Sequence, residues 1–208
     1  MQPIEKVIDL LLKNVDEIST GLKKLKETDH LSDNKNFENL CDELYFLSER
    51  HTSNFRQFIQ NTYVKNRNEV MSNSCDISGI DVCKKDGKVF ITLPCLLPRK
   101  KGNEHKFIGE PLRYKLEELS KNVNLKIREK AVVCIIHTYD NANKKARCYD
   151  YDNLETKKIL DIITLYTLID DAPPFCDVYH TIRFSDQDKT TIIVMPIGSF
   201  DGKIVPYN

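Results

Sequence analysis

The chain has 208 residues, which is enough for one domain of ordinary size or for a small domain with an appendage. Its 31 basic and 31 acidic residues cancel, so the overall charge gives no sign of a nucleic-acid partner, and any such binding would depend on local patches. The seven cysteines are odd in number and form no CxxC pair, which argues against a zinc site and against a disulfide framework.

The N-terminal segment lacks a basic region followed by an uninterrupted apolar core, so it does not have the pattern of a signal peptide. No apolar run approaches the roughly twenty residues that span a bilayer. The sequence therefore predicts a cytoplasmic protein that makes no contact with a membrane.

Two amphipathic helices are predicted at the start of the chain. Apolar residues recur every three or four positions from Ile4 to Leu25, and again from Phe37 to Ile59, with a polar stretch at 28–36 between them. Two long helices with a short connection predict an antiparallel hairpin over residues 1–66. Its exposed apolar stripe is expected to pack on the rest of the chain or on a second copy.

The remainder of the chain is predicted to be a polar linker at 67–78, an α+β domain at 79–200 and an irregular tail at 201–208. Asp86-Gly87 between two β-prone runs indicates a β-hairpin. A helix over 110–122, a strand over 131–139, a helix after Asn153, and strands over 176–184 and 190–195 follow. The predicted order is two helices and then β-β-α-β-α-β-β, which is an α+β fold class.

The segment 147–171 contains two acidic pairs that suggest metal chemistry. Asp150 and Asp152 precede an amphipathic helix, and Asp170 and Asp171 follow it. If the helix returned the second pair towards the first, the carboxylates would repel one another unless a hard divalent cation such as Mg²⁺ or Mn²⁺ bound between them. The alternative is that these residues serve as helix caps and turns, for which Asp and Asn are common.

Three short motifs carry a family resemblance: ITLP at 91–94, DYDNL at 150–154 and IDD at 169–171. With these motifs, the segment 88–197 resembles the RusA-like Holliday junction resolvases, which are magnesium-dependent endonucleases. The resemblance implies a mixed α/β RusA-like domain. Its catalytic metal ligands would be Asp150, Asp152 and Asp171, with Asp170 adjacent.

This sequence departs from the resolvase pattern at one catalytic position. Thr156 stands where the family usually has a lysine, and Lys157 and Lys158 follow it. One residue along a helix rotates a side chain by about 100°, so either lysine would reach the scissile phosphate from a different direction. In the resemblance, Lys157 or Lys158 would neutralise the transition state.

The resemblance further implies a homodimer that cuts branched or structured DNA during recombination or repair. The basic residues that would contact the DNA backbone are Arg99, Lys100, Lys101, Lys106, Lys144, Lys145 and Arg147. Two alternatives stay open. The domain could be a catalytically inactive DNA-binding or protein-interaction module of a phage or mobile element, with a protein partner for the helical hairpin, or the helices could serve oligomerisation alone.

Overall fold

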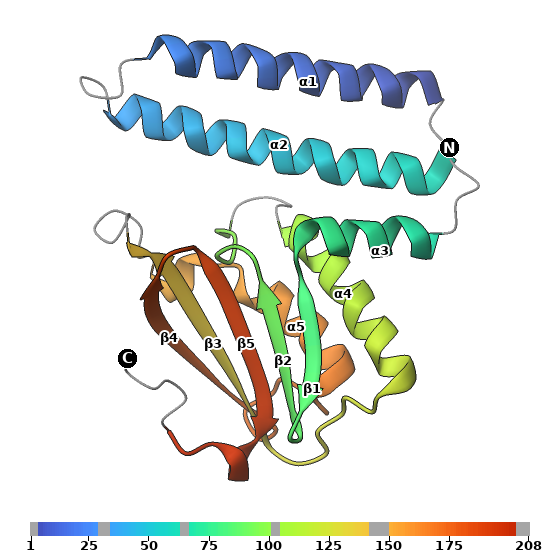
Figure 1. Cartoon of the computed structure of the whole chain (residues 1–208), viewed down its shortest axis with the longest axis vertical. Helices are drawn as coiled ribbons and strands as arrows, with labels where there is room; N and C mark the ends of the chain where they lie inside the picture. Colours follow the sequence, from blue (N-terminus) through green and yellow to red (C-terminus); the bar gives the residue numbers. More distant parts are fainter. Residues whose placement is uncertain (1–3, 29–33, 63–66, 101–104, 142–149, 203–208) are drawn as a thin grey trace. The chain divides into compact units, whose positions relative to one another are not determined.

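The computed structural model describes residues 4–28, 34–62, 67–100, 105–141 and 150–202 (Figure 1). The chain divides into two compact units, residues 1–70 and residues 71–208. Among the described helices, none combines the length and the apolar character needed to cross a membrane.

The first unit is the predicted helical hairpin. Helix α1 (Ile4–Glu27) packs against helix α2 (Asn34–Thr62), with Leu11 and Leu44 among the buried residues. The apolar spacing of both segments explains this packing, because residues three or four apart lie on the same helical face. Arg50 lies 3.7 Å from Glu17 across the two helices. The prediction of a hairpin is confirmed.

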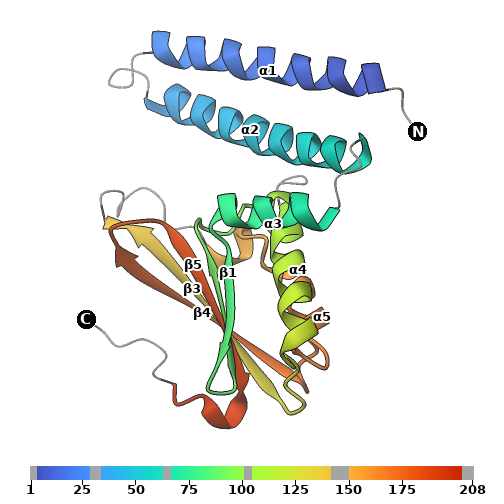
Figure 2. The ribbon, with the colours of Figure 1, turned by 45° about the vertical axis from the view of Figure 1, so that its right-hand side comes forward.

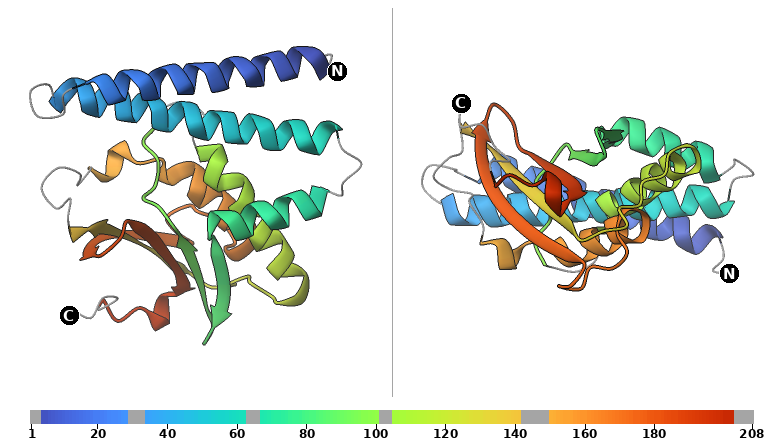
Figure 3. Two further views of the ribbon diagram at one scale, coloured as in Figure 1. Left: turned by 45° about the horizontal axis from the view of Figure 1, so that its top comes forward. Right: turned by 90° about the horizontal axis from the view of Figure 1, so that it is seen from below.

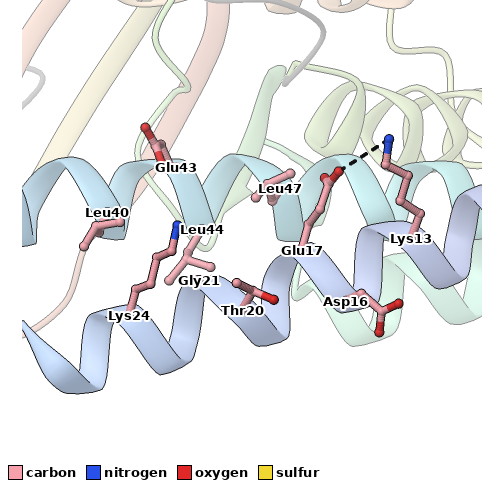
Figure 4. Close-up of a pocket in the computed structure, with 10 residues that line it drawn as sticks. All are labelled: Lys13, Asp16, Glu17, Thr20, Gly21, Lys24, Leu40, Glu43, Leu44 and Leu47. Carbon is pink, nitrogen blue, oxygen red and sulfur yellow. Dashed lines mark ion pairs between the residues drawn. The ribbon is translucent and has the colours of Figure 1, made fainter.

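Gly21 marks the place where α1 and α2 approach most tightly, beside an open pocket (Figure 4). A Cβ added at Gly21 would overlap the Leu44 side chain. The pocket is also lined by Leu40 and Leu47 and is bordered by charged residues, including the Lys13–Glu17 pair at 3.9 Å. Glycine here allows Leu44 to fill the space between the helices.

We expect Gly21→Ala to destabilise the hairpin by about 1–3 kcal/mol because of overpacking against Leu44, although alanine is the better helix former by about 1 kcal/mol. Hydrogen exchange of the α1 amides would measure the change. In a Leu44→Ala background the overlap disappears, so the same substitution should slow exchange. Faster exchange in both backgrounds would contradict this explanation.

The stretch predicted as a linker is instead a helix, α3 (Arg67–Ser78). Its sequence is polar and has weak helical periodicity, so its stability comes from contacts with the second unit rather than from an apolar face. Met71 and Cys75 are buried, the Cys75 thiol lies 3.3 Å from the Pro111 carbonyl oxygen, and Asp76 pairs with Lys115 at 3.5 Å.

The second unit contains a mixed five-stranded sheet with the strand order β1-β2-β5-β3-β4. The strands are β1 (Asp81–Lys85), β2 (Lys88–Leu93), β3 (Ala131–Asp140), β4 (Cys176–Ser185) and β5 (Lys189–Pro196). Strands β3 and β4 are parallel, and all other neighbours are antiparallel. Asp86 and Gly87, with φ of 51° and 74°, form the predicted turn between β1 and β2. The strand that comes last in this sequence therefore lies in the middle of the sheet.

Helices α4 (His105–Asn122) and α5 (Thr156–Thr167) cover one face of the sheet (Figures 2 and 3). Leu116 of α4 and Ile163 of α5 are fully buried against alternate residues of β2, β3 and β5. Helix α4 begins before the predicted residue 110, so Pro111 lies inside the helix and not in its first turn. The predicted α+β class, with a helical hairpin ahead of a mixed sheet, is confirmed.

Candidate functional site

The residues of the predicted metal site lie on two turns. Asp150 and Asp152 are exposed and flank Tyr151 in the 3-10 helix η2 (Tyr151–Asn153), where the Asn153 amide donates to the Asp150 carbonyl oxygen at 3.0 Å. The Asp170 carboxylate accepts a hydrogen bond from the Ala172 amide at 3.1 Å, as in an Asx turn. Both turns use these residues in local backbone chemistry.

Asp171 has a basic neighbour that the sequence did not indicate. Its carboxylate lies 3.9 Å from the Lys157 ammonium, which also lies 3.4 Å from Asp161, while Lys158 pairs with Glu155 at 3.3 Å. Within the described residues, which include all four predicted carboxylates, no group of three or more His, Cys, Asp or Glu side chains is close enough to hold a metal ion.

Two of the predicted DNA-contacting residues lie beside the acidic turn. Arg99 forms a β-bridge with Leu154, and the Lys100 amide donates to the Asn153 carbonyl oxygen at 2.9 Å. Lys106 belongs to the first turn of α4. The remaining predicted residues, Lys101, Lys144, Lys145 and Arg147, lie outside the described part of the chain.

A pair of histidines at the sheet was not predicted. Ala131, Val133 and Ile135 of β3 face the core under the helices, and the period of two puts His137 on the same face. His137 is fully buried, and its Nε2 lies 3.1 Å from Nδ1 of His180 on the neighbouring strand β4. A signal was present, because His137 is the one titratable side chain in the otherwise apolar run from Ala131 to Ile136 and beyond it to Thr138.

The two imidazoles meet edge to edge. Their planes differ by 8° and their centroids are 5.4 Å apart, which is the nitrogen separation plus about two ring radii, so the rings are nearly coplanar along an N–H···N hydrogen bond. The Tyr151 ring lies over both, 5.6 Å from His137 and 4.8 Å from His180. This in-line geometry directs the two nitrogen atoms at each other and leaves no place for a metal ion between them.

Burial lowers the pKa of His137 to about 4, and the neighbouring His180 charge lowers it further in the same direction. Burial also lowers the pKa of His180. Both rings are therefore neutral at pH 7 and can share one proton along their hydrogen bond. The His137 Nδ1 atom is buried and has no hydrogen-bond partner within the described part of the chain.

The largest exposed apolar feature of α1 is a line of aliphatic side chains. We call it the α1 stripe: Ile4, Ile8, Leu12, Val15 and Leu22, each between 40% and 58% exposed. Scattered exposed aliphatic residues are normal, but a contiguous row on one helix face indicates an interaction surface.

The α1 stripe belongs to a longer heptad pattern. Every position in the alternating four-three series 4, 8, 11, 15, 18, 22 and 25 is apolar, which is the a/d pattern of a coiled coil. Leu11, Ile18 and Leu25 are buried or half-buried, whereas Ile8, Val15 and Leu22 are exposed. Helix α2 thus covers one side of the heptad seam and leaves the other side in solvent.

A family model matches residues 1–205, which is nearly the whole chain, and it describes DUF6100, a family of unknown function. The chain belongs to the DUF6100 family. The comparison with curated proteins gives no match to this DUF6100 chain. Among solved structures, the periplasmic domain of MotB from Helicobacter pylori is similar over 62% of this chain and 91% of that domain, at 8% identity and a TM-score of 0.34. A likeness this distant carries no functional argument.

The resemblance to RusA-like resolvases is wrong. The DUF6100 match includes the helical hairpin and the α/β unit together, and the resolvase pattern has no counterpart for the hairpin. The motifs that suggested it are short, and the structure accounts for them locally. Residues 91–93 end β2, Asp150 and Asn153 form a 3-10 turn, and Asp170 stabilises the turn after α5.

Proposed function

We propose that this DUF6100 protein is a self-assembling interaction protein, in which the α1 stripe pairs with the α1 stripe of a second copy. The supporting observation is the half-covered heptad seam of α1. In a two-helix hairpin each helix has one neighbour, whereas in a four-helix bundle it has two, and apolar positions on both sides are then buried. A second hairpin would cover Ile8, Val15 and Leu22 as α2 covers Leu11 and Ile18.

The charges beside the α1 stripe favour antiparallel pairing of the two helices. Glu5 and Asp9 lie near the start of α1 and Lys23 and Lys26 near its end, and all four are exposed. Antiparallel helices that cross at Val15 place Glu5 of one copy beside Lys26 of the other. Parallel helices would place Glu5 beside Glu5 and Lys26 beside Lys26, which is unfavourable.

The expected affinity is modest. Burying the exposed half of each stripe side chain contributes about 1 kcal/mol, so the ten side chains of a dimer contribute about 10 kcal/mol in total. Loss of translational and rotational freedom costs about 4–15 kcal/mol. We therefore expect a reversible dimer with a dissociation constant in the micromolar range, well short of a permanent complex.

Sedimentation equilibrium of the full chain, over a range of concentrations, would test this proposal. Val15→Glu places two carboxylates at the crossing point and should weaken self-association about 100-fold, which corresponds to about 3 kcal/mol. Leu10→Glu is the matched control, because Leu10 is 48% exposed on the same helix but lies outside the α1 stripe. Equal effects of the two substitutions would refute pairing through the stripe.

A charge exchange would test the direction of pairing. Glu5→Lys and Lys26→Glu should each weaken self-association, and the double variant should restore it, since antiparallel pairing only exchanges the two charges. If the double variant is as weak as the singles, the helices do not pair in this direction.

The endonuclease prediction, its Mg²⁺ or Mn²⁺ cofactor and its branched-DNA substrate stay untested, as does the catalytically inactive alternative. The resemblance that supported them is gone, and we do not propose them as the function. Self-association and a protein partner for the hairpin are the parts of the sequence prediction that this proposal develops.

A further inference from the structure

The two edges of the sheet differ in how they are protected from pairing with another strand. Edge strand β1 has five residues and ends in Lys84 and Lys85, and short length and lysine are common devices that block edge pairing. Edge strand β4 has ten residues, with no lysine, no proline and no bulge in its ten consecutive pairs with β3. In the part of the chain that the structure describes, no strand pairs with the outer edge of β4.

The side chains of β4 add apolar surface to this open edge. Val178, Tyr179 and Phe184 are between 37% and 47% exposed. Val178 and Phe184 lie on the helix-covered face by their register with β3, and Tyr179 lies on the opposite face, where its ring is 4.6 Å from that of Phe200. An apolar, ten-residue edge with unpaired backbone groups is suited to accept a further strand.

We propose that β4 is a second self-association surface, which pairs antiparallel with β4 of another copy to form a continuous ten-stranded sheet. This proposal is independent of the α1 stripe, because it rests on a different unit of the chain.

Charge complementarity supports a second copy as the occupant. The charged side chains of β4 are Asp177 and Arg183, three residues on either side of His180. When two copies pair antiparallel around His180, Asp177 of each lies opposite Arg183 of the other, Val178 lies opposite Ile182, and Tyr179 lies opposite Thr181. Opposite-charge and aromatic cross-strand pairs each contribute about 0.2–1 kcal/mol.

The same register is consistent with the faces of the sheet. A two-fold axis perpendicular to the sheet keeps the helices of both copies on one side, so even-numbered residues must lie opposite even-numbered residues and odd opposite odd. Pairing around His180 satisfies this requirement. Asp177 also bonds Lys130 at 2.8 Å within its own chain, and a carboxylate can accept from both basic groups.

Tyr179→Lys introduces an edge lysine of the kind that protects β1, and Val178→Lys does so on the other face. Leu165→Lys is the matched control, because Leu165 is 55% exposed on α5 and distant from the edge in sequence and element. Sedimentation equilibrium of the full chain should show loss of one association step in both β4 variants and no change in the control. Equal masses for the β4 variants and the control would overturn the proposal.

Combining the variants separates the two association surfaces. With both surfaces active, the chain should form species larger than a dimer. Val15→Glu or Tyr179→Lys alone should give dimers, and the double variant should give monomers. If Val15→Glu has no effect and Tyr179→Lys alone gives monomers, the hairpin proposal fails and the β4 proposal stands.

Hydrogen exchange identifies the occupant of the edge. Outward amides of β4 should be protected at high protein concentration and exchange faster on dilution. Protection that persists in the monomeric double variant would mean that the chain covers its own edge, and would rule out the second copy.

Discussion

Ile163→Ala is expected to lower the free energy of unfolding of the α/β unit by about 3 kcal/mol, within the range of about 2–5 kcal/mol for such truncations. Ile163 is fully buried between α5 and the sheet, and the surrounding core includes Leu116 of α4 and Ile135 of β3. Truncation leaves a cavity among residues that two helices and three strands hold in place, so the site has little freedom to collapse. Urea unfolding followed by far-UV circular dichroism would measure the change, since the chain has no tryptophan.

Leu165→Ala, two residues further along α5, is the control for the Ile163 substitution. Leu165 is 55% exposed, so the same change of side chain should alter stability by less than about 0.5 kcal/mol. A loss at Leu165 as large as the loss at Ile163 would mean that α5 does not pack on the sheet through the face described above.

The histidine pair should make the α/β unit less stable in mild acid. The pKa of His137 is about 4 in the folded chain and about 6.5 when unfolded, so between these values the unfolded state binds more protons. The stabilisation is complete above about pH 6.5 and is lost as the pH falls towards 4. At 1.36 kcal/mol for each pKa unit, the loss is up to about 3 kcal/mol, and the lowered pKa of His180 acts in the same direction.

Urea unfolding of the wild type and of His137→Gln, at several pH values from 7.5 to about 4.5, would test this pH dependence. The variant should be less stable at pH 7.5 because it loses the bond between the two imidazoles. The difference between the two proteins should shrink as the pH falls, since glutamine does not titrate. A difference that stays constant with pH would show that His137 is not the group responsible.

The elements that the sequence predicted well are those whose stability is visible in local pattern. Helices α1 and α2 have a three-or-four apolar spacing, and the Asp86-Gly87 turn has the two residues that tolerate positive φ best in a two-residue hairpin. Helix α3 lacks such a pattern. It is held by Met71, Cys75 and Asp76 through contacts with α4, and no local signal announces those contacts.

The functional predictions failed or stayed open for a related reason. Asp150, Asp152 and Asp170 match a metal-site spacing, but aspartate at a turn has the same spacing for conformational reasons. His137 was visible as a polar residue in an apolar strand. Its partner was not, because His180 reaches it only through the parallel register of β3 and β4, which pairs Ala131 with Cys176.

The position of β5 has a consequence for how the chain is made. During synthesis, the β1–β2 hairpin and the strands β3 and β4 leave the ribosome before the strand that joins them, because β5 pairs with β2 on one side and with β3 on the other. Until Lys189–Pro196 has emerged, the apolar faces of β2 and β3 have no common sheet, and contacts as distant as Leu93 with Thr190 cannot form. The α1–α2 hairpin has no such delay. Nascent chains on neighbouring ribosomes could therefore pair through their helices before either sheet is complete.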